Sequence, residues 1–235
     1  MRGILFDKDG TLIDFHASWS GVYRELGLEL SGGDADRANA TLAAGGMDPD
    51  TGRVRAGSVL AAGNTIDIAK LFFPELGGAE LKRRIERIDA VFYENGIKCS
   101  VPVPRLGETL AALAEMGLAM GVATSDGTAA TKAALGALGI ARHLPHVYGY
   151  DSVARPKPAP DMVHAFAAAI GAPAHAIVVI GDNTHDLEMA RSAGAGAAIG
   201  VLSGTGTAAE LAPLADLLLD SIADLPGWLA ARPGD

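Results

Sequence analysis

The feature that most constrains the fold is the long gap between the first apolar run of the chain and the next ones. Residues 4–6 (ILF) stop at the polar sequence DKDGT, a pattern typical of a buried strand that ends in a loop. Similar runs come only in the second half, at 118–123, 176–180 and 197–201, with a weaker one at 217–219. Helix-compatible segments separate these late runs, and strands that alternate with helices predict a parallel sheet.

The stretch between the first two strands predicts helices and no convincing strand. Helical patterns cover 18–28, 34–44, 57–72 and 79–93. The prolines of the sequence VPVP that follows predict a stiff, extended exit. We therefore expect an α/β core, a doubly wound (Rossmann-like) parallel sheet formed by residues 1–13 and 101–235, and an inserted all-helical segment of residues 14–100.

Composition excludes several classes of protein. The chain has 235 residues, 49% of them apolar, and a formal net charge of −9, which disfavours nucleic acid as a partner. Cys99 is the single cysteine, so no intrachain disulfide can form, as expected in a reducing compartment. No apolar stretch is long enough for a transmembrane helix, and no signal peptide is recognisable. We expect a cytoplasmic protein that binds no membrane; its oligomeric state stays open.

Polar residues follow three of the expected strands, and the carboxyl ends of parallel strands form the ligand-binding edge of an open sheet. These residues are Asp7 and Asp9, then Thr124, Ser125 and Asp126, then Gly181, Asp182, Asn183 and Asp186. Carboxylates that converge in one crevice repel one another unless a cation neutralises them. A hard divalent ion with oxygen ligands is the natural partner, and Mg²⁺ is favoured because it also coordinates phosphate.

A basic residue completes this pattern. Lys157 lies in the sequence RPKP, where the flanking prolines stiffen the loop and limit where its ammonium can reach. A lysine is a compact positive charge suited to phosphate. The backbone N–H groups of the loop at Gly10 would add further donors for phosphate oxygens.

Four motifs in order now resemble a known family, the haloacid dehalogenase-like phosphohydrolases, over nearly the whole chain. They are FDKDGTLID at 6–14, VATSD at 122–126, RPKPAPD at 155–161 and GDNTHDLEMARSAG at 181–194. The helical segment after the first motif is similar to the helical cap of the family, and the subgroup most resembled contains phosphoglycolate phosphatase. The resemblance implies a phosphatase that acts on a small phosphorylated metabolite, such as phosphoglycolate or a sugar phosphate.

The resemblance also implies a role for each site residue. Asp7 would be the nucleophile and form an aspartyl-phosphate, and Asp9 would protonate the leaving group and then activate water. Thr124 would hydrogen-bond the phosphoryl group, with the Ser125 backbone beside it, and Lys157 would stabilise the charge of nucleophile and phosphate. The residues expected at the Mg²⁺ ion are Asp7, the backbone carbonyl of Asp9, Asp182 and, as a nearby orienting group, Asp186.

Two residues of the first motif separate activities. An acid at Asp9 argues for phosphoryl transfer, because the dehalogenases of the family lack it. Lys8 replaces the apolar residue frequent between the two aspartates, and it would either contact the substrate phosphate or point outward.

Alternatives remain at this stage. A phosphomutase of the β-phosphoglucomutase type would use the same intermediate, and a receiver-like phosphoacceptor domain would share the acidic pocket. Further candidate residues have solvated or structural readings that are favoured over a role in the site: His143, His146 and His185, and, as possible contacts for a distal anion, Arg53, Arg55 and Lys70.

Overall fold

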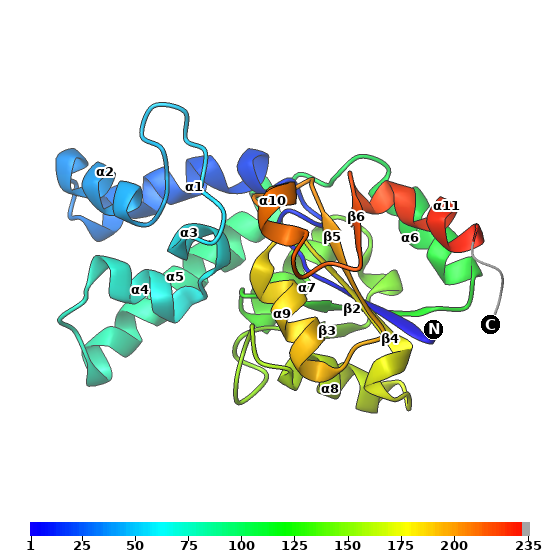
Figure 1. The fold of residues 1–235 in the computed structure, drawn as a ribbon. Coiled ribbons are helices and arrows are strands. Elements are labelled where there is room, and N and C mark those ends of the chain that lie inside the picture. The colour runs from blue at the N-terminus through cyan, green and yellow to red at the C-terminus, as the bar shows by residue number, and fades with distance from the viewer. Residues whose placement is uncertain (232–235) are drawn as a thin grey trace.

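The structure, a computed structural model, describes residues 1–231; residues 232–235, the end of the expected core segment, lie outside the described residues. Its centre is a parallel six-stranded sheet with the order β3-β2-β1-β4-β5-β6 (Figure 1). The strands are β1 Gly3–Phe6, β2 Ala119–Ala123, β3 His146–Tyr148, β4 Ile177–Gly181, β5 Ala197–Val201 and β6 Leu217–Leu219. The strand order reverses beside β1, which therefore lies at the switch point where ligands bind in such sheets.

Helices cover both faces of the sheet, as a doubly wound fold requires. They are α6 Leu106–Glu115, α7 Thr128–Ala137, α8 Asp161–Ala169, α9 Thr184–Ala193, α10 Ala208–Leu211 and α11 Leu225–Ala230, with short 3₁₀ turns at Ala141–His143, Ala174–Ala176 and Ile222–Asp224. Successive strand residues point to opposite faces. Phe6 and Ile180 accordingly pack with α6, α7 and α11, whereas Leu5 and Val179 pack with α8, α9 and α10. The predicted α/β fold is confirmed.

The inserted segment is helical and lies at one end of the core (Figure 1). Its helices are α1 Phe15–Leu30, α2 Ala35–Ala44, α3 Val59–Ala62, α4 Thr65–Phe72 and α5 Gly78–Cys99. They bury an apolar cluster of their own, built around the aromatic residues of α1 and Phe92 of α5. We call this segment the cap.

The chain enters and leaves the cap side by side. The Asp14 N–H donates to the Val101 carbonyl at 2.8 Å, and the Val103 N–H donates to the Leu12 carbonyl at 3.0 Å. The cap is thus joined to the core by two adjacent chain segments, at residues 13/14 and 100/101, which is where we propose to divide the chain.

One local prediction was wrong, and two further elements were not predicted. The expected helix 57–72 is two helices, because Gly63 interrupts it and Asn64 starts α4 with a capping box that Asp67 completes. The edge strand β3, which begins at His146, was not predicted, because it is only three residues long and half-buried and its hydrophobic pattern is therefore weak. The first helix of the core after the cap, α6, was not anticipated.

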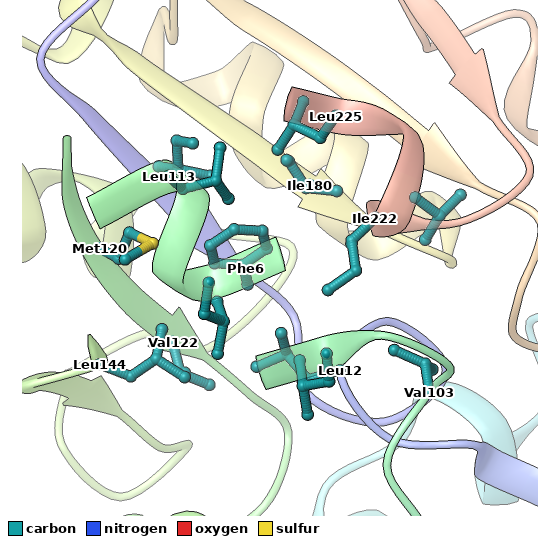
Figure 2. Packing of buried hydrophobic residues seen from close by; sticks show 14 of the residues in the cluster. Phe6, Leu12, Val103, Leu113, Met120, Val122, Leu144, Ile180, Ile222 and Leu225 are labelled. Carbon is teal, nitrogen blue, oxygen red and sulfur yellow. The ribbon is translucent and has the colours of Figure 1, made fainter. Parts of the chain in front are cut away.

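Figure 2 shows the apolar cluster between the sheet and helices α6 and α11. Leu113 of α6 is fully buried there among Phe6, Ile180 and Leu225. This layer packs against one face of the sheet and supports the strands whose ends carry the loops of the site.

In the part of the chain that is described, no helix combines the length and the hydropathy that crossing a membrane requires.

Leu113→Ala tests this packing. Because it removes a fully buried side chain from a dense cluster, the free energy of unfolding should fall by about 2–5 kcal/mol in urea denaturation. Met116→Ala, at the end of the same helix and 44% exposed, is the matched control and should change it by less than about 0.5 kcal/mol. A loss at Leu113 no larger than the loss at Met116 would contradict the arrangement.

Candidate functional site

Three neighbouring strands deliver the site. Phe6 of β1 is in register with Val122 of β2 and with Ile180 of β4, so the loops that follow begin at the same level of the sheet. The Asp7 N–H still donates to the Ile180 carbonyl at 2.7 Å, and the Thr124 N–H donates to the Tyr148 carbonyl at 2.9 Å. The backbone is thus held beyond the strand ends, and the side chains of Asp7, Thr124 and Asp182 come together in one cavity.

Asp7, Asp182 and Asp186 form a buried carboxylate cluster, in which one oxygen of each lies within 4.8 Å of the others. Asp186 is placed by helix α9, where it accepts from the Asn183 N–H at 3.1 Å as part of the helix capping box. Thr205 N–H donates to Asp182 Oδ2 at 2.7 Å, which leaves the other oxygen of Asp182 to face a ligand. The structure therefore brings together three residues that the sequence suggested for a metal.

Lys157 bridges this cluster. Its Nζ lies 2.6 Å from Asp7 Oδ1 and 2.5 Å from Asp186 Oδ1, and its side chain is buried. Burial alone would lower the pKa of this ammonium, but Asp186 and Asp7 outweigh burial and raise it. Burial raises the pKa of Asp7 well above its usual range against the opposing effect of Lys157, and burial together with Asp186 raises the pKa of Asp182 to about 7.

The cluster has the composition of a divalent-cation site. One ammonium among three buried carboxylates leaves negative charge in a place where it is costly without a cation. Carboxylate oxygens are the hard ligands that Mg²⁺ prefers. Because both oxygens of Asp186 already have donors, Lys157 and Asn183, Asp7 and Asp182 are the carboxylates better placed to contact the ion, with Asp186 orienting them.

The backbone of the loop after β1 passes close to the carboxylate cluster at Gly10. Gly10 has a φ of +91°, and a Cβ atom there would overlap the carboxylate of Asp182. The Gly10 N–H donates to the Ile13 carbonyl at 2.7 Å. This N–H is therefore engaged within the loop, and Gly10 also makes room for Asp182. The expectation that N–H groups of this loop bind phosphate stays a prediction.

The side chain of Asp9 belongs to a second polar group, next to the carboxylate cluster. Asp9 Oδ1 accepts from the Trp19 indole N–H of the cap at 2.5 Å, and Asp9 Oδ2 lies 2.8 Å from Lys8 Nζ. Lys8 Nζ also lies 2.5 Å from Asp126 Oδ2 and 5.1 Å from the centre of the Trp19 ring. Burial raises the pKa of Asp9, although Lys8 opposes the shift.

Lys8 differs from both expectations. It neither points outward nor reaches the phosphate region, because its side chain is 1% exposed, is paired with two carboxylates and is absent from the cavity lining among the residues described. Asp126 and Asp9 raise its pKa in spite of burial, which would lower it. A buried ammonium between two acids is paired as such groups must be.

Thr124 and Ser125 lie where the sequence placed them, on the cavity wall after β2. Thr124 is buried, and its Oγ1 accepts from the Asp126 N–H at 3.1 Å. The Ser125 hydroxyl donates to the Ala62 carbonyl of the cap at 3.1 Å. Ser125 therefore contributes to the junction of core and cap as well as to the cavity.

The cavity between core and cap has a volume of about 40 Å³, room for only a few water molecules. The core supplies its acids, Lys157, Thr124, Ser125, Asn183 and His185. The cap supplies a wall of apolar and aromatic residues, namely Phe15, Trp19, Tyr23, Leu60, Ala61, Ala62, Gly63 and Phe92.

Sequence reasoning missed this wall and gave Asp126 no role. Phe15, Trp19 and Tyr23 recur every four residues in α1, a spacing that could have revealed one aromatic face. Asp126 stands in the second motif, but only the fold brings it to Lys8.

Other candidates lie apart from the site or have no assigned role. Arg53 and Arg55 line a different groove, and Lys70 lines another. His143 ends a 3₁₀ turn and His146 begins β3. His185 does line the cavity, and its Nδ1 is buried without a hydrogen-bond partner.

Comparison with known proteins agrees with this geometry. A model of the family described as "haloacid dehalogenase-like hydrolase" matches residues 1–194. The chain is 31% identical to a probable phosphatase, IndB, of Dickeya dadantii over 95% of this chain and 91% of the relative. It is 28% identical to a phosphoglycolate phosphatase of Pectobacterium atrosepticum over 96% and 91%.

A solved structure shares the fold. The crystal structure of a predicted phosphoglycolate phosphatase from Haemophilus somnus superposes with a TM-score of 0.74 at 22% identity and covers 97% of this chain and 98% of that one. Together with the family match over most of the chain, the parallel sheet, the carboxylate cluster and the inserted cap lead to one assignment: the chain belongs to the haloacid dehalogenase-like hydrolase family.

Proposed function

We propose that the protein is a Mg²⁺-dependent phosphatase that hydrolyses a small phosphate monoester through an aspartyl-phosphate on Asp7. The observation that carries the proposal is the contact of Lys157 with both Asp7 and Asp186 in a buried carboxylate cluster. An ammonium fixed beside a carboxylate at a ligand-binding sheet edge suits a negatively charged phosphoryl group. The phosphatase names of the relatives support the same reaction class.

The side chains divide the reaction between them. A carboxylate oxygen of Asp7 attacks phosphorus, the bond from phosphorus to the ester oxygen breaks, and Asp9 gives its proton to the departing oxygen. Asp9 then takes a proton from a water molecule, which attacks the phosphorus of the aspartyl-phosphate. This releases inorganic phosphate and restores Asp7. Burial raises the pKa of Asp9 in the direction that the first step requires, whereas its contacts with Lys8 and Trp19 lower it.

Binding and orientation fall to the remaining groups. Lys157 would hold Asp7 in place and offset phosphoryl charge, and the Thr124 hydroxyl would donate to a phosphoryl oxygen. Asp7, Asp182 and the Asp9 carbonyl would hold Mg²⁺, with Asp186 orienting. When bound, Mg²⁺ supplies charge neutralisation and alignment of the phosphoryl group.

The cap would act as a lid. A cavity of about 40 Å³ is too small for a phosphate ester together with Mg²⁺, so the cap would move away from the core to admit substrate and would stay further from the core while substrate is bound. A cytoplasmic location, which the single cysteine favours, stays a prediction.

A phosphomutase is the second candidate, and one observation disfavours it. A mutase must hold the phosphate of its product while a second phosphoryl group sits on Asp7. Among the residues described, Lys157 is the single lysine or arginine that lines the cavity, and it already contacts Asp7.

A receiver-like domain is disfavoured because the cap encloses the acids and because an acid follows two residues after Asp7.

Asp7→Asn should abolish release of inorganic phosphate from 4-nitrophenyl phosphate, a loss of about 1,000-fold or more, because an amide is a poor nucleophile. Folding should be kept, as judged by circular dichroism and the melting temperature. Asp14→Asn, which changes a similar residue at the start of α1, is the control and should stay near the wild-type rate. Near wild-type activity in Asp7→Asn would show that another residue is the nucleophile.

Removal of divalent ions tests the metal assignment. After treatment with a chelator, activity should fall to background and return with Mg²⁺. Mg²⁺ should also raise the melting temperature, because it relieves repulsion within the carboxylate cluster and binds only the folded chain. Asp182→Asn should reduce this thermal shift. Full activity without divalent ions, or an equal shift in the Asp182 variant, would refute the site.

A further inference from the structure

We propose that this site selects phosphate esters whose leaving group is uncharged and has an apolar face, and that it disfavours esters with a second anion, such as phosphoglycolate. The inference rests on the proposed function and deepens it, because it concerns the part of the substrate that departs rather than the phosphoryl group. The observation behind it is the contrast between the two sides of the cavity.

The cap side of the cavity is apolar and aromatic. Its two polar-tipped aromatics have already used their donors: the Trp19 indole N–H donates to Asp9, and the Tyr23 hydroxyl donates to the Leu60 carbonyl at 2.9 Å. Trp19, Tyr23 and Phe92 pack against one another edge-on or tilted. What remains for a substrate on this side is ring surface and aliphatic carbon, which suits an uncharged group.

The charges that line the cavity are mostly negative. The carboxylates that line the cavity are those of Asp7, Asp9, Asp126, Asp182 and Asp186. Lys157 is the single lysine or arginine in this lining over residues 1–231, and two of the carboxylates already hold its ammonium. Lys8 is equally committed, to Asp9 and Asp126, and stays outside the lining. A bound divalent ion and Lys157 would be needed for the transferring phosphate itself.

No lysine or arginine of the cap lines the cavity among the residues described. Lys70 lines a neighbouring groove that shares Ala62, Gly63 and His185 with the cavity. Arg24 donates to the Pro49 carbonyl at 3.2 Å. Arg53 and Arg55 line a groove with Thr205 and Glu210, and that groove is distinct from the cavity in the structure. A carboxylate or second phosphate on the leaving group would therefore face the aromatic wall, and no lysine or arginine of the described lining would be free to pair with it. An unpaired charge in such a site is costly, whereas an uncharged group is not.

Matched substrates test the proposal. We would compare kcat/KM for 2-phosphoglycolate with that for its uncharged amide, and for 4-carboxyphenyl phosphate with that for phenyl phosphate, with Mg²⁺ present. In each pair the uncharged ester should be preferred by about tenfold or more, as expected for a charge placed near others in a partly buried site. Equal rates within a pair, or preference for the anionic member, would overturn the inference.

The same experiment separates this inference from the proposed function. Release of phosphate from 4-nitrophenyl phosphate reports the basal reaction, independent of the matched pairs. If no ester in the panel is hydrolysed, the proposed function fails. If phosphate is released but phosphoglycolate is the preferred member of its pair, the phosphatase assignment stands and the selectivity proposal fails.

A charge placed in the wall should reverse the preference. Ala61 of α3 lines the cavity and takes no part in the proposed chemistry. Ala61→Lys should shift the ratio of kcat/KM by about tenfold in favour of phosphoglycolate, because it supplies the missing counter-charge. Ala61→Met, of comparable length without the charge, should leave the ratio within about twofold. An equal effect of both variants would point to shape rather than charge and would contradict the proposal.

Two further variants exclude other sources of charge recognition. Arg53→Ala together with Arg55→Ala, in the neighbouring groove, and His185→Gln, on the core side of the cavity, should leave the ratio unchanged. A selective loss of phosphoglycolate turnover in either variant would show that the site does recognise a second anion and would overturn the inference.

Discussion

The structure depends on the burial of several carboxylates at one edge of a parallel sheet. Charge of one sign is unstable in a partly desolvated place, so each acid needs a partner. Lys157 forms ion pairs with Asp7 and Asp186, and Lys8 forms one with Asp9. The Thr205 N–H donates a hydrogen bond to Asp182. The remaining negative charge is what would attract the proposed divalent ion and, with that ion, phosphate. Local electrostatics thus reverse what the net charge of the chain suggests.

Much of the fold could be predicted because buried strands of a parallel sheet are continuous apolar runs. Five of the six strands were recognised in this way, including β1 in spite of its distance from β2. The edge strand β3 was missed because it is short and only half-buried, so no apolar run marks it. The prediction of one helix over 57–72 was wrong for a local reason: Asn64 is the N-cap residue of α4, so a new helix starts there although the helical spacing of apolar residues continues across it.

The candidate site was predictable where motifs carry its residues and not where tertiary contacts do. Asp7, Thr124, Lys157 and Asp182 meet in one cavity as the sequence suggested, although their roles stay proposals. The partners of Lys8 could not be predicted, because Asp126 lies 118 residues away and only the pairing of β1 with β2 brings them together. The aromatic wall could not be predicted either, because its residues face the acids only after α1 has packed against α3 and α5.

The ion pair between Lys8 and Asp126 makes the residue tolerated at one position depend on the residue at the other. Replacing Lys8 by an apolar residue alone would leave the carboxylates of Asp9 and Asp126 without their buried cation, whereas neutralising Asp126 alone would still leave Lys8 paired with Asp9. Loss of Lys8 is therefore more harmful in a chain that keeps Asp126 than in one where Asp126 is already neutral, so the two positions are energetically coupled. Relatives with an apolar residue at the position of Lys8 should therefore also have an uncharged residue at the position of Asp126.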